Sequence, residues 1–86
     1  MNATILQRFL AVECSPYVRD LMRTALELAR SGAGPRRKRF EFNLFEVSFD
    51  LDEGVVLIEE VLNAGEDGMQ SIPMDAFLLE LNKKQY

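Results

Sequence analysis

Two runs of charged side chains are the parts of this sequence best suited to binding chemistry. The first run is basic and stands directly before Phe40: Arg36, Arg37, Lys38 and Arg39. Adjacent cations beside an aromatic ring suit a nucleic acid, because cations bind phosphates and the ring stacks on a base. The second run is acidic and follows it: Glu46, Asp50, Asp52 and Glu53. Carboxylates along a rigid ribbon suit a protein partner with a basic surface and speed the encounter with it.

These two runs belong to a division of charge along the whole chain. Residues 1–39 carry a net charge of +5 and residues 40–86 one of −9, which leaves −4 over the 86 residues. The sequence pI is about 4.7, whereas nucleic-acid-binding domains are usually basic overall. We therefore expect a protein partner, with nucleic acid as the alternative. The basic run also has a simpler interpretation, as a solvated connector that pairs with the acidic half.

The residue types argue against an enzyme. The chain has no His, and Cys14 is its one cysteine. This excludes a Ser-His-Asp triad, a Cys-His pair, zinc sites built on histidine or several cysteines, and an intramolecular disulfide. The acidic segment 50–54 lacks the remaining oxygen ligands of a calcium loop, and segment 32–35 lacks the Lys-Ser/Thr of a phosphate-binding loop. We expect a non-catalytic protein without metal or cofactor, and a buried, inert Cys14.

Length and composition indicate one ordinary globular domain spanning 1–86. The chain is 48% hydrophobic and 28% charged, as soluble domains are. No stretch approaches the ~20 apolar residues of a membrane span. The first residues lack the basic region of a secretion signal, and a lone cysteine fits a reducing compartment. We expect a cytoplasmic protein with no membrane partner.

Hydrophobic periodicity predicts helices in the first part of the chain. Apolar residues spaced by one, three and four predict a short helix over 3–13. Ser15 is a good N-cap and Pro16 a good first helical residue, so a second helix is predicted from there to about Arg30. Gly32 or Gly34 ends it.

The second part of the chain alternates as a β-structure. We predict one strand over 40–51, with a bulge or bend between Leu44 and Phe45 because the apolar phase reverses there. A three-residue turn at 52–54 returns the chain into a strand over 55–62, in a register that sets Phe49 opposite Leu57. A short third strand over 69–72 and a C-terminal helix capped by Ser71 or Asp75 follow.

The predicted fold class is therefore α+β, with two N-terminal helices, an antiparallel β-hairpin with a short third strand, and a C-terminal helix. In the predicted register, three apolar residues lie on the hairpin face opposite Phe49 and Leu57: Val56, Ile58 and Leu62. Either the C-terminal helix covers this second face or the face is an interface. An interface there would suit an adaptor or subunit, or a homodimer.

In layout and size, the hairpin over 40–62 and the closing segment over 71–81 resemble the small, acidic, cytoplasmic immunity proteins of bacterial toxin–immunity pairs. Those of contact-dependent growth inhibition are among them. The resemblance implies a protein that neutralises another protein by binding it, and it assigns no role to any residue here. We therefore expect a toxin inhibitor of the immunity-protein kind, with a nucleic-acid-associated regulator using residues 36–39 as the alternative.

Overall fold

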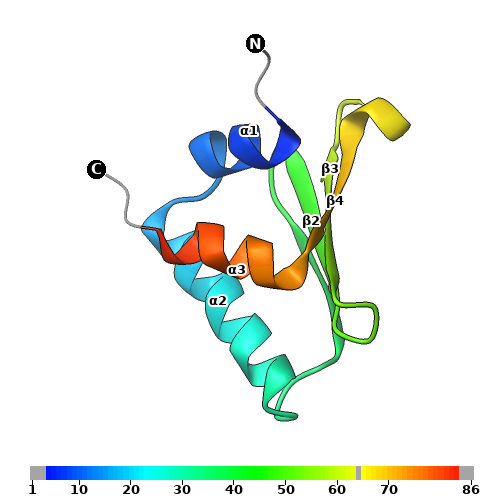
Figure 1. The fold of residues 1–86 in the computed structure, drawn as a ribbon. Helices are drawn as coiled ribbons and strands as arrows, with labels where there is room; N and C mark the ends of the chain where they lie inside the picture. Colours follow the sequence, from blue (N-terminus) through cyan, green and yellow to red (C-terminus); the bar gives the residue numbers. More distant parts are fainter. Residues whose placement is uncertain (1–3, 64, 84–86) are drawn as a thin grey trace.

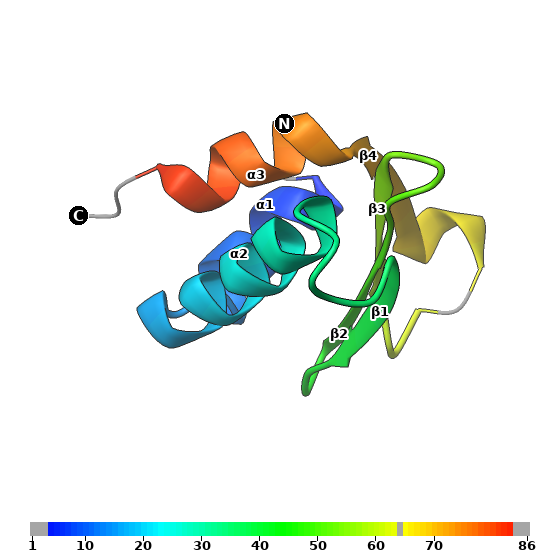
Figure 2. The same ribbon diagram turned by 90° about the horizontal axis from the view of Figure 1, so that it is seen from below.

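The described residues of the protein fold into two layers, a four-stranded antiparallel sheet and three α-helices that all lie on one face of it (Figures 1 and 2). The structure is a computed structural model and describes residues 4–63 and 65–83. The α+β class is as expected from the sequence. The opposite face of the sheet, called the outer face below, is covered by none of the described helices (Figure 2).

Local signals in the sequence explain both N-terminal helices. Helix α1 (Ile5–Val12) begins with a capping box, in which the Thr4 side chain accepts from the Gln7 N–H and the Gln7 side chain accepts from the Thr4 N–H. Helix α2 (Pro16–Arg30) begins as predicted, with the Ser15 side chain accepting from the Val18 N–H. Both predicted helices are confirmed.

The sheet contains more strands than the predicted hairpin with a short third strand. Its strands follow the chain in the order β1 (Arg37–Glu41), β2 (Phe45–Asp50), β3 (Val55–Glu60) and β4 (Met69–Pro73), each antiparallel to the next. The single strand predicted over 40–51 was wrong, because it is a hairpin. Its turn lies at the phase reversal, where the Phe42 N–H donates to the Phe45 carbonyl over 2.9 Å. Even-numbered apolar residues before the turn and odd-numbered ones after it therefore lie on the same face of the sheet. A bulge in a single strand would have given the same alternation of faces.

The second hairpin has a longer loop than the sequence suggested. Gly54 has a φ of +70°, as expected for the turn, but its N–H donates to the Asp50 carbonyl over 2.8 Å. The loop therefore spans four residues, 51–54, and Phe49 pairs with Val56 instead of Leu57. A slip of one residue turns every side chain of β3 to the other face. The predicted second apolar face was therefore wrong: Val56 and Ile58 point toward the helices and are 0% exposed.

The last two elements meet without a loop. The predicted third strand is β4, which follows a short 3-10 helix, η1 (Glu66–Gly68), and runs directly into helix α3 (Met74–Asn82). Because β4 continues into the helix, Pro73 itself occupies the N-cap position and no side chain caps it. Neither Ser71 nor Asp75 is the cap, contrary to the prediction.

The core lies between the helices and the sheet. Large side chains from both layers are completely or almost completely buried there: Phe9, Met22, Leu26, Val47, Val56, Ile58 and Phe77. Cys14 is buried at the edge of this core, and its burial raises the pKa of the thiol, partly offset by the charge of Arg19. None of the described helices is long and apolar enough to cross a membrane.

Candidate binding surface on the outer face of the sheet

The outer face is a grid in which alternate residues of the four strands stand side by side. Antiparallel pairing places directly opposite residues on the same face, so the pairing register defines its rows. From one end of the sheet to the other, the rows are Arg37, Asp50, Val55 and Pro73; Arg39, Ser48, Leu57 and Ser71; and Glu41, Glu46, Glu59 and Met69. The grid contains Glu46 and Asp50 from the acidic run and Arg37 and Arg39 from the basic run.

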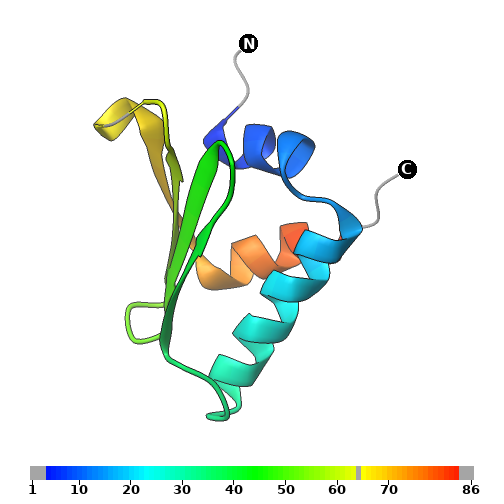
Figure 3. The same ribbon diagram turned by 180° about the vertical axis from the view of Figure 1, so that it is seen from behind.

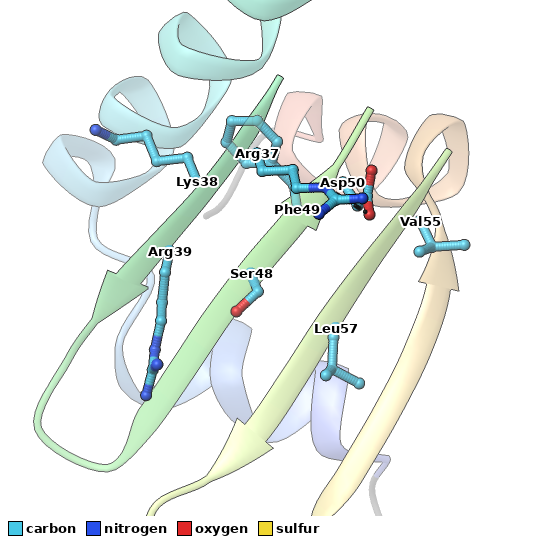
Figure 4. A pocket seen from close by; sticks show the side chains of 8 residues that line it. All are labelled: Arg37, Lys38, Arg39, Ser48, Phe49, Asp50, Val55 and Leu57. Carbon is cyan, nitrogen blue, oxygen red and sulfur yellow. Dashed lines mark ion pairs between the residues drawn. The ribbon is translucent and has the colours of Figure 1, made fainter. Parts of the chain in front are cut away.

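The basic and acidic runs are thus one site and not two. Arg39 Nη2 lies 2.6 Å from Glu46 Oε2, and Arg37 Nε lies 3.2 Å from Asp50 Oδ2. Figure 4 shows Arg37 reaching across from β1 to Asp50 on β2. This is the pairing of the basic run with the acidic half that the sequence offered as its simpler interpretation. Most of the charge in both runs is consequently neutralised within the molecule.

Two of the expected partner-binding carboxylates also hold the loop at 51–54. Asp50 Oδ1 accepts from the N–H groups of Asp52 over 3.0 Å and Glu53 over 3.2 Å, as Asp commonly does in turns. Asp52 Oδ1 in turn lies 2.6 Å from Arg36 Nε. The Glu53 side chain is exposed and has no bonding partner among the described residues. Of the four predicted acidic residues, Glu53 is therefore the one without an internal role in the part of the chain described.

One row of the outer face concentrates negative charge. Glu41, Glu46 and Glu59 lie side by side across three strands, an arrangement in which like charges repel. Arg39 lies in the neighbouring row, and its pKa is raised by its hydrogen bond and charge contact with Glu46 and by the charges of Glu41 and Glu59. Together with the loop at 51–54, this surface carries two guanidinium groups and six carboxylates, and Arg36, which pairs with Asp52, adds a third guanidinium, so the surface remains acidic overall.

The middle of the outer face is apolar. Val55 and Leu57 are half-buried on β3 and line a hollow of about 480 Å³, with Arg37, Arg39 and Asp50 around it (Figure 4). Leu57 is on the surface and not in the predicted core, because the predicted register was displaced by one residue. With the four-residue loop, simple alternation from the core residues Val56 and Ile58 would have identified it.

The basic run does not have the arrangement expected for stacking on a base. Phe40 is only 8% exposed and points into the core. Lys38 Nζ lies 5.6 Å from the centre of the Phe40 ring, on the helix side of the sheet. The aromatic ring expected beside the four cations is therefore occupied in packing and in a contact with its own chain.

Of the predicted apolar interface, only Leu62 is on the surface. It lies beyond the end of β3, is 86% exposed, and lines a smaller hollow of about 240 Å³ with Val12 and Leu44. Val56 and Ile58 are core residues on the opposite side of β3 from Leu57. Among the described residues, no group of three or more Cys, Asp or Glu side chains is arranged to hold a metal ion.

Comparison of the chain with models of protein families, with curated proteins and with solved structures found no match.

Proposed function

We propose that this protein is a non-catalytic, cytoplasmic binding protein that neutralises a protein partner through the outer face of its sheet. An immunity protein that inhibits a bacterial toxin is the most concrete form of this function. The observation that carries the proposal is the apolar hollow at Val55 and Leu57, which no described helix covers and which charged residues of β1 and β2 flank. An apolar centre with a polar rim is the usual anatomy of a protein interface.

The charge of this surface supports a partner with a basic patch. The arginines of β1 neutralise Glu46 and Asp50, but Glu53 and Glu59 have no bonding partner among the described residues. Carboxylates at a rim attract a cationic partner and mainly raise the rate of association. Glu46, Asp50, Asp52 and Glu53 remain proposed contacts, with Glu59 added to them. Glu46, Asp50 and Asp52 already form ion pairs with arginines of their own chain, so a cation of the partner would share these carboxylates with the arginines.

The function is tested by recovering the partner from the native host with tagged protein and then measuring the affinity of the purified pair. Leu57→Asp places a charge in the apolar hollow, and we expect it to weaken the complex at least tenfold. Leu79→Asp is the matched control, because Leu79 is an exposed leucine of α3, in the helical layer. Inhibition of the partner's activity by the wild type, and its loss with Leu57→Asp, would support neutralisation as the outcome of binding.

A second pair of variants separates charge from apolar contact. Glu53→Lys with Glu59→Lys should slow association and reduce its dependence on salt, while leaving the Tm unchanged. The proposal is wrong if Leu57→Asp and the double lysine variant bind the recovered partner as tightly and as fast as the wild type does. The exposed cluster at Val12, Leu44 and Leu62 would then be the next surface to test.

A further inference from the structure

The two edges of the sheet differ in what they offer to another strand. In the order β1-β2-β3-β4, the edges are β1 and β4. At β4, Pro73 stands at a position whose backbone points away from β3, because the neighbouring Met74 N–H donates inward to the Gly54 carbonyl over 2.9 Å. Proline has no N–H and blunts that edge against a further strand. Strand β1 contains no proline.

The backbone of β1 presents a regular set of donors and acceptors at its free edge. Leu51 donates to the Arg36 carbonyl over 2.8 Å and Phe42 to the Phe45 carbonyl over 2.9 Å. In an antiparallel pair, every second residue bonds to the neighbouring strand, so Lys38 and Phe40 bond to β2. The backbone groups of the alternate residues point outward, where no described strand meets them: Arg37, Arg39 and Glu41.

We propose that β1 pairs with β1 of a second copy of this chain, antiparallel and symmetric about Arg39, to form a continuous eight-stranded sheet. Arg37 of each copy then stands opposite Glu41 of the other, which gives two pairs of opposite charge. At the axis, Arg39 stands opposite Arg39. On the helix side of the sheet, Lys38 of each copy stands opposite Phe40 of the other. Each Arg39 enters the pair already bound to Glu46 of its own chain.

The charge pattern of β1 selects this register over its neighbours. Symmetry about Lys38 would set Lys38 against Lys38 and each Arg37 against an Arg39, which makes three like-charge pairs instead of the one at Arg39. Symmetry about Phe40 would overlap only residues 39–41 of each five-residue strand. Symmetry about Arg39 uses the whole strand and gives two Arg37–Glu41 pairs. The sequence of β1 is thus complementary to itself in one full-length register.

An apolar stripe lies beside this edge on the helix side of the sheet. Tyr17, Leu21 and Leu28 of α2 are 75%, 41% and 46% exposed. The stripe and Lys38 of β1 line one hollow of about 410 Å³. Figure 2 shows α2 on the β1 side of the helical layer, and Figure 3 follows the short connection from α2 into β1.

A two-fold axis through Arg39 explains the stripe. Such an axis is perpendicular to the sheet and keeps both helical layers on the same side, so the two stripes face each other. A stable dimer buries about 800 Å² on each partner, more than a five-residue strand edge provides by itself. The stripe supplies apolar area at the place where the second copy would lie. The two outer faces remain uncovered, so this pairing is separate from the proposed binding of a partner.

Sedimentation of the whole chain at increasing concentration tests the pairing. We expect the mass to rise from 9.8 kDa toward twice that value. Arg37→Glu and Glu41→Arg each create like-charge pairs across the axis and should weaken the dimer about tenfold or more. The double variant restores both pairs with exchanged signs and should recover most of the affinity. Asp67→Arg, in η1 and outside β1, is the matched control and should leave the dimer unchanged.

Amide hydrogen exchange of the wild type gives a readout that does not depend on how the variants fold. The N–H groups of Arg37, Arg39 and Glu41 point outward in the monomer and should become protected as the protein concentration rises. The proposal is overturned by a monomer at all concentrations up to the millimolar range. It is also overturned by a dimer in which these three amides still exchange freely, or one that both single variants leave intact.

Discussion

Arg39 and Glu46 bind each other across the first hairpin, with 2.6 Å between Nη2 and Oε2, although they come from the two runs that separate the charge of the sequence. Arg37 and Asp50 also form an ion pair, but they stand directly opposite one another, whereas Arg39 stands opposite Ser48 and reaches diagonally to Glu46. Exposed ion pairs of this kind add little to stability. Their effect here is to join the basic and the acidic parts of the sequence within one hairpin, so that each neutralises charge on the other.

Gly54 is the first position at which the loop geometry can be tested. Its φ of +70° lies in the left-handed region, and nothing stands within 4 Å of an added Cβ. Gly54→Val should therefore destabilise by backbone strain alone, by about 1–2 kcal/mol. A domain of this size loses roughly 4–8 °C in Tm for each kcal/mol. A thermal melt measures the loss, and Gly54→Asn should lose less because Asn tolerates this conformation. Equal Tm values for all three proteins would contradict the turn.

We expect the Asp50 side chain to stabilise the loop at 51–54 in addition to carrying negative charge. Its side chain accepts two loop N–H groups and pairs with Arg37. Asp50→Ala removes all three contacts and should cost about 1–3 kcal/mol, the range for losing hydrogen bonds to a charged group. Asp50→Asn keeps an oxygen acceptor and should cost less. Glu53→Ala is the control in the same loop, and its denaturation midpoint should match that of the wild type. If Asp50→Ala unfolds at the wild-type midpoint, the side chain does not hold the loop.

Local signals were sufficient to predict the helices but not the first strand. Ser15 as N-cap and Pro16 as first helical residue define the start of α2. Gly54 likewise marks the loop between β2 and β3, because its φ is positive. Strand β1 has no such signal, because residues 37–39 are all charged and show no apolar alternation. Its strand conformation depends on pairing with β2, and residues 37–39 themselves do not show which part of the chain they pair with. A pattern search along the chain does not contain that information.

The candidate surface was predicted in its residues but not in its arrangement. The charged residues named from the sequence do lie together, yet their mutual pairing needed the β1–β2 register. The apolar part was assigned to the wrong side of β3, because a three-residue and a four-residue loop both require a glycine at 54. Loop length alone decided whether Leu57 or Val56 faces outward. Register is specified by the burial of a whole face, and two apolar faces on β3 left it ambiguous.

The buried thiol of Cys14 gives a prediction about pH. Burial raises the pKa of the folded thiol above its ordinary 9.0, with Arg19 opposing the shift. The unfolded chain therefore loses its thiol proton at a lower pH than the folded protein does. The contribution of the thiol to stability is complete below pH 9 and is lost as the pH rises toward the folded pKa.

Chemical denaturation at pH 7 to 10.5 measures this loss. The wild-type free energy of unfolding should fall more steeply above pH 9 than that of Cys14→Ala, which has no thiol to titrate. The two proteins share every other titrating group, so the difference between their pH profiles isolates the thiol. Parallel profiles would mean that the thiol is equally acidic in the folded and unfolded chains.

The basic run gives the last prediction, which separates a protein partner from a nucleic acid. Arg36, Arg37 and Arg39 are bound to carboxylates of their own chain, and Phe40 is buried. A phosphate would have to displace those carboxylates. We expect duplex and single-stranded nucleic acids to bind no more tightly than about 10⁻⁴ M, in the non-specific range.

Two variants test this prediction, one that frees the arginines and one that removes the basic run. Glu46→Gln and Asp50→Asn together remove the ion pair of Arg37 and the closer of the two ion pairs of Arg39, while keeping side-chain size. This variant should bind DNA more tightly than the wild type and with a steeper dependence on salt, since each phosphate neutralised adds about −0.9 to the log–log slope on duplex DNA. Replacing all four residues of the basic run by Ala should abolish the binding that remains. Fluorescence anisotropy with labelled oligonucleotides over a range of salt concentrations measures both effects.

A sequence-selective wild-type complex of micromolar affinity or tighter would show that phosphates compete successfully with Glu46 and Asp50, and would make nucleic acid the partner of this surface.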